Sequence, residues 1–114
     1  MAESGYHFEI GELIRHVRYG YRGVVAGRDP ECRADDDWYF RNQTQPDRGQ
    51  PWYHVLVHGG RHTTYVAQEN LVADEGGEQV IHPLVKVFFE YFHGGRHHPR
   101  ADIEFPGLAS DHGR

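Results

Sequence analysis

Glycine and proline divide this chain into short apolar segments, and this division limits the folds that it can adopt. The clearest segment, residues 51–57, alternates large side chains between two faces and is rich in aromatic and β-branched residues, as strands are. A turn over 58–61 with two central glycines leads to an apolar segment over 63–67, which predicts a β-hairpin. Three further segments have a strand-like pattern: 8–16, 21–27 and 71–72. Five short strands with tight glycine turns predict a mainly β chain folded as an SH3-like small β-barrel.

The segment 83–94 has apolar residues at a spacing that favours an α-helix. Pro83 suits the first helical position, and Gly94 suits the residue that follows the last turn. The large apolar side chains between them fall within an arc of about 140° on a helical wheel. Val87 and Tyr91 widen this arc, so the helix would have more apolar surface than one small barrel covers. We therefore expect one C-terminal α-helix with an apolar face open to a partner.

We expect one domain over 8–99, a flexible N-terminus over 1–7 and an irregular tail over 100–114, in which 103–105 could form an edge strand. A chain of 114 residues can bury a core without metal or disulfide staples. Its one cysteine, Cys32, cannot form an internal disulfide, which favours a reducing compartment. Neither a secretory signal nor an apolar run of membrane-spanning length is recognisable, so we expect a cytoplasmic protein without a membrane partner.

The charged residues are distributed unevenly along the chain. The formal net charge is −5, yet eleven of the twelve basic residues are arginines, and there are ten histidines. Protonation of all ten histidines near pH 6 would change the net charge from −5 to +5. The segment 15–28 is basic, whereas 31–37 and 69–78 are mainly acidic. Any contact with DNA is therefore expected at a local basic patch.

The basic segment contains four arginines and no acidic residue. The candidate DNA-binding residues are Arg15, His16, Arg18, Tyr19, Tyr21, Arg22 and Arg28. Guanidinium groups match phosphate oxygens and guanine edges, and tyrosine rings can stack along a nucleic acid. The alternative is that the arginines form the solvated face of a hairpin and pair with Glu9, Glu12 or the acidic run 35–37.

A long loop over 31–50, with one expected helical turn near Trp38, contains a second candidate site. Loops of this length in a small domain are uncommon and are often functional. Its aromatic residues, and the apolar side of the expected helix, suggest a surface for a protein partner. The candidate protein-interaction residues are Trp38, Tyr39, Val87 and Tyr91. The alternative is that these side chains belong to the core or anchor the loop.

Catalysis and metal binding have weaker support. The chain has no Walker loop, no GxSxG and no GxGxxG motif, and Cys32 lies in a polar loop without a nucleophile signature. The histidines occur without HExxH or CxxC spacing, so surface or hydrogen-bonded histidines are expected in place of a zinc site. We expect no enzyme activity, no metal and no cofactor.

Several sequence blocks occur in a specific order. They are Tyr19-Gly20-Tyr21-Arg22-Gly23-Val24-Val25, Asp29-Pro30, Pro51-Trp52-Tyr53-His54-Val55-Leu56-Val57 and Thr64-Tyr65-Val66-Ala67-Gln68-Glu69-Asn70-Leu71. Together with residues 10–16, these blocks resemble the hemimethylated-DNA-binding (YccV-like) domain family. This family includes the bacterial heat-shock protein HspQ and a C-terminal domain of some eukaryotic F-box proteins. The resemblance covers about 8–99, and the long loop and the segment after Pro83 are more similar to the F-box version.

The resemblance implies an SH3-like barrel that binds DNA, with a preference for hemimethylated sites, or that serves as an accessory factor of an ATP-dependent protease. Neither role is catalytic. We therefore expect a domain that binds duplex DNA through the arginine-rich hairpin. The alternative is a protein-interaction or adaptor module that recognises a protease or its substrate, or that forms a homo-oligomer. The acidic net charge opposes attraction to phosphate and weighs against DNA.

Overall fold

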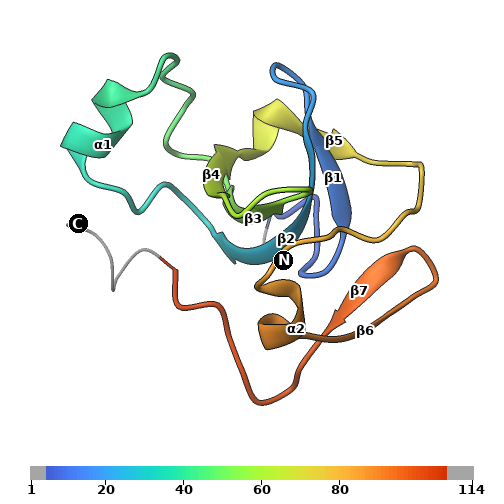
Figure 1. Cartoon of the computed structure of the whole chain (residues 1–114). Coiled ribbons are helices and arrows are strands. Elements are labelled where there is room, and N and C mark those ends of the chain that lie inside the picture. The colour runs from blue at the N-terminus through green and yellow to red at the C-terminus, as the bar shows by residue number, and fades with distance from the viewer. Residues whose placement is uncertain (1–4, 108–114) are drawn as a thin grey trace.

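The computed structural model describes residues 5–107 as a set of short strands and shorter helices (Figure 1). The strands are β1 (Leu13–His16), β2 (Arg22–Asp29), β3 (Trp52–Val57), β4 (Thr63–Ala67), β5 (Leu71–Ala73), β6 (Phe89–His93) and β7 (Arg96–Pro99). The helices are α1 (Asp36–Arg41), the 3-10 turn η1 (Gln68–Asn70) and α2 (Val85–Phe88). Within the described range, every helix is too short to cross a membrane.

Strands β1 to β5 form one antiparallel sheet in the order β4-β3-β2-β1-β5, so the last strand pairs with the first. This confirms that the protein is mainly β and contains the expected hairpins β1–β2 and β3–β4. The register of β2 against β3 shifts between Val25 and Gly27, as a β-bulge does. Among residues 5–107, β4 and β5 remain the two edges of the sheet, so the hydrogen-bonded ladder does not close into a barrel.

Both faces of the sheet are covered, because side chains of each strand alternate between two hydrophobic clusters. Tyr53 and Val55 of β3 belong to one cluster with Phe8, and Leu56 belongs to the other with Phe89. The segment before β1 covers the first face, and the segment from α2 to β7 covers the second (Figure 1). The alternation in 51–57 therefore predicts correctly that Tyr53 and Val55 face one way and Leu56 the other.

The expected helix over 83–94 is wrong beyond Phe88. Only α2 is helical, and the chain then forms the hairpin β6–β7, a second two-stranded sheet. Gly94 and Gly95 both have positive φ (66° and 80°), as a two-residue type I′ turn requires. The aromatic and β-branched residues of this segment favour a strand, and Gly-Gly closes the hairpin. Consequently Val87 and Tyr91 lie on different elements and do not share a helix face.

The strand expected to start at residue 8 starts only at Leu13, because the backbone turns at Gly11. Gly11 has a φ of 97°, and a Cβ atom there would lie 1.9 Å from the carbonyl oxygen of His97. The N–H of His97 donates to the Gly11 carbonyl at 2.9 Å, so β7 docks against the main sheet at this point. Only glycine permits this close approach.

The C-terminal segment has an irregular backbone between β7 and residue 107. Residues 103–105 do not form the expected edge strand. Instead the ring of Phe105 packs against His54 at 5.0 Å and Phe88 at 5.2 Å. The ends of the expected flexible N-terminus and of the expected tail, 1–4 and 108–114, lie outside the described residues.

Candidate functional site

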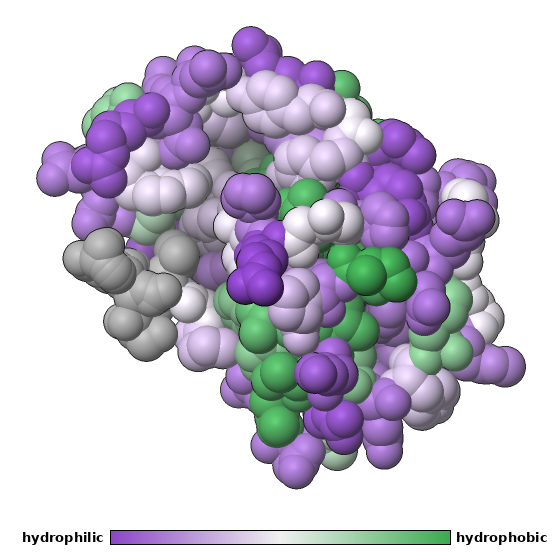
Figure 2. All heavy atoms as spheres, viewed as in Figure 1, coloured by the Kyte–Doolittle hydropathy of each residue, from purple (hydrophilic) through white to green (hydrophobic). Residues whose placement is uncertain are grey.

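A groove of about 650 Å³ opens between the β1–β2 turn, the loop after α1 and the β3–β4 hairpin. Its lining consists of aromatic, histidine, amide, hydroxyl and small apolar residues. Among the described residues, no aspartate, glutamate, lysine or arginine lines it. Figure 2 shows the molecule hollowed between α1 and the sheet, with side chains of intermediate hydropathy around the hollow and hydrophobic residues gathered over α2. We call this site the aromatic groove.

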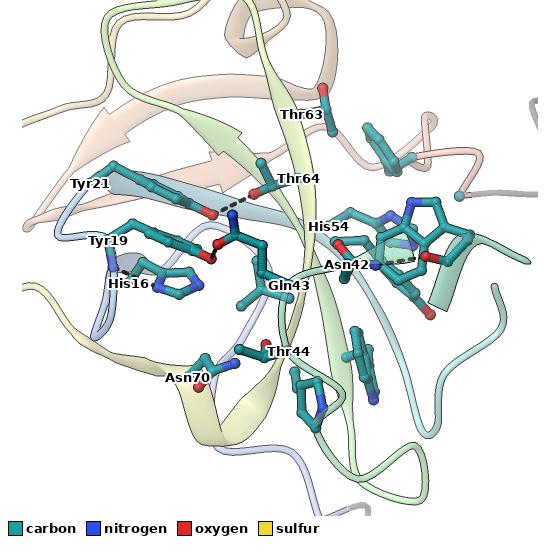
Figure 3. Close-up of a pocket in the computed structure, with 18 of the residues that line it drawn as sticks. His16, Tyr19, Tyr21, Asn42, Gln43, Thr44, His54, Thr63, Thr64 and Asn70 are labelled. Carbon is teal, nitrogen blue, oxygen red and sulfur yellow. Dashed lines mark hydrogen bonds between the residues drawn. The ribbon is translucent and has the colours of Figure 1, made fainter. Parts of the chain in front are cut away.

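The β1–β2 hairpin provides one wall of the aromatic groove, built around the buried His16 (Figure 3). The backbone N–H groups of Arg18 and Tyr19 donate to His16 Nδ1 at 3.0 Å and 3.1 Å. Burial and then the charge of Arg18 lower the pKa of His16, so the ring stays neutral near pH 7 and keeps this acceptor. The rings of Tyr19 and Tyr21 lie 4.7 Å and 5.1 Å from the imidazole. His16 therefore fixes the turn that carries Arg18 and Tyr19.

Rings from α1, β3 and β4 provide the other wall. Asp35 caps α1 by accepting a hydrogen bond from the N–H of Trp38 at 2.9 Å, and this cap positions the indole. The Trp38 ring meets Trp52 at 6.1 Å and Tyr65 at 5.7 Å, both edge to face. Figure 3 shows His16, Tyr19 and Tyr21 on one side and Asn42 and His54 on the other.

A partly buried hydrogen-bond network lies behind this second wall. Tyr65 Oη donates to Asp29 at 2.6 Å, and His54 Nε2 lies 3.3 Å from the same carboxylate oxygen. Burial lowers the pKa of His54, although Asp29 opposes the shift. Burial and the hydrogen bond to Asp29 raise the pKa of Tyr65 far above its usual range. Both rings are therefore neutral near pH 7 and stack on each other at 4.5 Å.

The loop after α1 approaches the β1–β2 turn at the mouth of the aromatic groove. Tyr19 Oη donates to Gln43 Oε1 at 3.2 Å, and this bond joins the two lips (Figure 3). Asn42 Nδ2 donates to the Trp38 carbonyl at 2.8 Å, which holds the loop against α1. Gln43 Nε2 has no hydrogen-bond partner in the part of the chain that the structure describes. Its two N–H groups are available to a ligand.

Arg15 and Arg22 meet at one carboxylate. The two residues are directly opposite in the β1–β2 register, and Asp74 accepts from Arg15 at 3.1 Å and from Arg22 at 2.7 Å. Arg15 also donates to the Gly20 carbonyl, and Arg22 to the Glu78 carbonyl. Burial raises the pKa of Asp74, but the two guanidiniums outweigh this effect and lower it. The hairpin arginines thus pair with an acid, and that acid follows β5.

The remaining two arginines of the basic segment have different environments. Arg28 lies at the far end of β2, roughly 20 Å from the turn, where it donates to the Phe8 carbonyl at 2.9 Å and covers the Tyr6 ring at 4.1 Å. Arg18 is exposed at the turn, 5.8 Å from the Tyr19 ring centre, and forms no ion pair with a described residue. The structure therefore brings His16, Arg18 and Tyr19 together at the groove and places Arg28 elsewhere.

The candidate protein-interaction residues are also dispersed. Trp38 lines the aromatic groove, whereas Tyr39 is the buried residue of α1 and packs in a cluster with Trp52 and Ala67. Val87 lies on α2. Tyr91 lies on β6 and stacks on His98, with the ring centres 4.5 Å apart and the ring planes at 8° to each other. Between residues 5 and 107, no group of three or more His, Cys, Asp or Glu side chains is placed to hold a metal ion.

Sequence reasoning missed three residues of this region: Arg41, Gln43 and Asp74. The first two belong to the aperiodic loop 31–50, where only the unusual length of the loop signals a function. Asp74 reaches the arginines because β5 returns to pair with β1, and this pairing has no local sequence signal.

The fold and the aromatic groove define a small, mainly β binding domain. The family described as "Hemimethylated DNA-binding protein YccV like" matches residues 6–96, and the chain belongs to this family of DNA-binding domains. Among curated proteins, F-box only protein 21 of Homo sapiens, of Pongo abelii and of Mus musculus are each 37% identical over 101 residues. These matches cover 85% of this chain, which spans 16% of the length of each relative.

Proposed function

We propose that this chain is a non-catalytic, cytoplasmic domain that binds duplex DNA with its β1–β2 turn and the adjacent aromatic groove, with a preference for hemimethylated sites. The strand order, in which β5 returns beside β1, supports an SH3-like arrangement as the scaffold. Membership of the YccV-like family supports DNA as the partner. The observation that carries the proposal is the position of Arg18 beside the groove.

Arg18 combines two properties that phosphate binding requires. Its guanidinium is exposed and has no described carboxylate partner, so it can neutralise a phosphate without breaking an existing ion pair. His16 holds the turn through two backbone hydrogen bonds, so the backbone at Arg18 is ordered before DNA binds. Arg15 and Arg22 contribute less, because Asp74 already compensates their charges.

The substitution Arg18→Ala tests this proposal. Each phosphate contact makes the logarithm of the binding constant fall with the logarithm of the salt concentration, with a slope of about −0.9. The loss of one contact should therefore weaken binding about tenfold at about 0.1 M salt. Fluorescence anisotropy of a labelled duplex measures the affinity. Arg61→Ala is the matched control, because Arg61 is an exposed turn arginine that has no described ion pair and does not line the groove. Equal losses in the two variants would contradict a role for the β1–β2 turn.

A second candidate function is a protein-interaction or adaptor module, such as an accessory factor of an ATP-dependent protease. The specific observation is Phe40 on α1, which is 65% exposed, with the acidic Asp36 and Asp37 in the first turn of the same helix. This combination suits a basic partner with an apolar anchor. The test measures how fast a purified ATP-dependent protease degrades a protein substrate in the presence of the wild-type chain or of Phe40→Ser. The wild-type chain should change this rate, and Phe40→Ser should not. Sedimentation at several concentrations tests a homo-oligomer.

A further inference from the structure

The aromatic groove combines ring faces with uncharged hydrogen-bonding groups, and this combination limits what it can hold. Its volume of about 650 Å³ is in the range of pockets that enclose a small ligand. No charged aspartate, glutamate, lysine or arginine is among its described lining residues. A phosphate or a charged side chain placed inside would lose its hydration and gain no counter-charge. An uncharged planar group with polar edges fits this lining.

Amide and hydroxyl groups line the aromatic groove between its two walls. Figure 3 shows Gln43 and Thr64 between the tyrosines of one wall and His54 of the other. Gln43 Nε2 has no described partner, and its Oε1 accepts only the 3.2 Å bond from Tyr19. A side-chain amide can donate and accept at the same time along one edge of a nucleobase, as glutamine does with adenine. Aromatic rings stack on the faces of such a base.

Two exposed arginines directly precede residues that line the aromatic groove. Arg18 directly precedes Tyr19 on one lip, and Arg41 precedes Asn42 and Gln43 on the other lip. Both arginines are exposed, and neither pairs with a described carboxylate. Charge at the rim and none in the interior matches a nucleotide, whose phosphates are charged and whose base is not. A peptide backbone is uncharged, so it offers the two arginines no negative group to bind.

From this arrangement we propose that the aromatic groove receives one nucleobase rotated out of a DNA duplex. The inference rests on the proposed DNA-binding function and specifies which part of the DNA the groove takes. The base stacks between the two walls, and the Gln43 amide exchanges its bond with Tyr19 for bonds to the base edge. Arg18 and Arg41 hold the phosphates on either side of the rotated nucleotide.

Duplexes that differ in the cost of base rotation test this inference. The first has one orphan base opposite an abasic analogue, the second is fully paired, and the third has abasic analogues in both strands at that position. Because an unpaired base costs least to unstack, the first should bind at least about tenfold more tightly than the second. The third has a similar backbone defect without a base, so it should show no such preference.

Two independent signals separate DNA binding from base insertion. Anisotropy of a labelled duplex reports binding anywhere on the domain. Tryptophan emission reports the groove, because the two tryptophans of the chain, Trp38 and Trp52, both line it. The orphan-base duplex should quench this emission, and the doubly abasic duplex should leave it unchanged.

Gln43→Ala should reduce the affinity ratio between the orphan-base duplex and the fully paired duplex by about tenfold. One bidentate amide contact to a base contributes about this much. Gln79→Ala is the matched control, since Gln79 is exposed, has no described side-chain partner and lies outside the groove lining. It should retain the full preference.

The outcomes distinguish the inference from the proposed function. Binding of all three duplexes with equal affinity and unchanged tryptophan emission would overturn base insertion and leave DNA binding intact. Absence of binding to any duplex at low salt would overturn both. Quenching that rises with protein concentration without DNA would assign the groove to a second copy of the chain and overturn the inference.

Discussion

Several histidines of this protein accept hydrogen bonds from backbone N–H groups through a ring nitrogen. His16 Nδ1 accepts from two residues of the β1–β2 turn, and His97 Nε2 accepts from Val80 at 3.0 Å. Ring nitrogens of His58 and His82 accept from Ile81 and Leu84. Protonation of such a nitrogen would remove the acceptor and leave the N–H without a partner. At the scale of the residue, these histidines are structural links between loops and strands.

His97 gives the clearest expected pH dependence. Its side chain is 1% exposed, and burial, with smaller contributions from Arg22 and His98, lowers its pKa to about 4. The unfolded chain has the ordinary value of about 6.5, so unfolding takes up a proton between pH 6.5 and pH 4. The free energy of unfolding should therefore be constant above pH 7 and fall by about 3 kcal/mol as the pH decreases through this interval. Urea denaturation at a series of pH values measures it.

His97→Gln should flatten this curve, although His16 and His54 leave a smaller slope of the same sign because their pKa values are also lowered. His93→Gln, at an exposed position, is the control and should leave the curve unchanged. An unchanged slope in His97→Gln would show that His97 is not the residue responsible.

Asp74 joins three elements of the main sheet. Its carboxylate follows β5, and it holds Arg15 of β1 and Arg22 of β2, which are cross-strand neighbours of equal charge. Like charges in this position repel each other unless an acid lies between them. At the scale of the element, Asp74 therefore stabilises the hairpin whose turn carries Arg18 and Tyr19.

Asp74→Asn should lower the free energy of unfolding by about 2 kcal/mol, because it leaves two facing guanidiniums without a counter-charge. Glu75→Gln, which removes one negative charge at an exposed neighbouring position, should change it by less than about 0.5 kcal/mol. Asp74→Asn also frees the charges of Arg15 and Arg22, so it should bind duplex more tightly than Glu75→Gln. Equal stability of the two variants by urea denaturation would contradict the role of Asp74.

The sequence predicts elements that local patterns define and misses those that depend on long-range pairing. The alternation in 51–57 and the glycines at 58–61 predict β3, its two faces and its hairpin with β4. The sequence predicts a helix over 83–94, where the structure has α2 and the strand β6. Short apolar runs fit a helix and a strand equally well, and here the Gly94-Gly95 hairpin turn decides for a strand. Tyr19 and Trp38 were recognisable as aromatic candidates, whereas Gln43 meets Tyr19 only through the path of an aperiodic loop.

At the scale of the whole molecule, the net charge of −5 is an average over regions with different roles. Burial lowers the pKa values of His16, His54 and His97, that of His97 to about 4, so the full reversal to +5 expected from the sequence requires a lower pH than ordinary histidines would need. Two of the hairpin arginines are compensated by Asp74. Arg18 and Arg41 directly precede lining residues of the aromatic groove and form no ion pair with a described residue, so the proposed contact with phosphate relies on these two cations.

The most direct test of DNA binding by this domain is an anisotropy titration of labelled unmethylated, hemimethylated and fully methylated duplexes at two salt concentrations. Two phosphate contacts predict that affinity falls about tenfold between about 50 mM and about 200 mM salt. The hemimethylated duplex should bind most tightly at both concentrations. Absence of binding, or binding that does not depend on salt, would contradict the account.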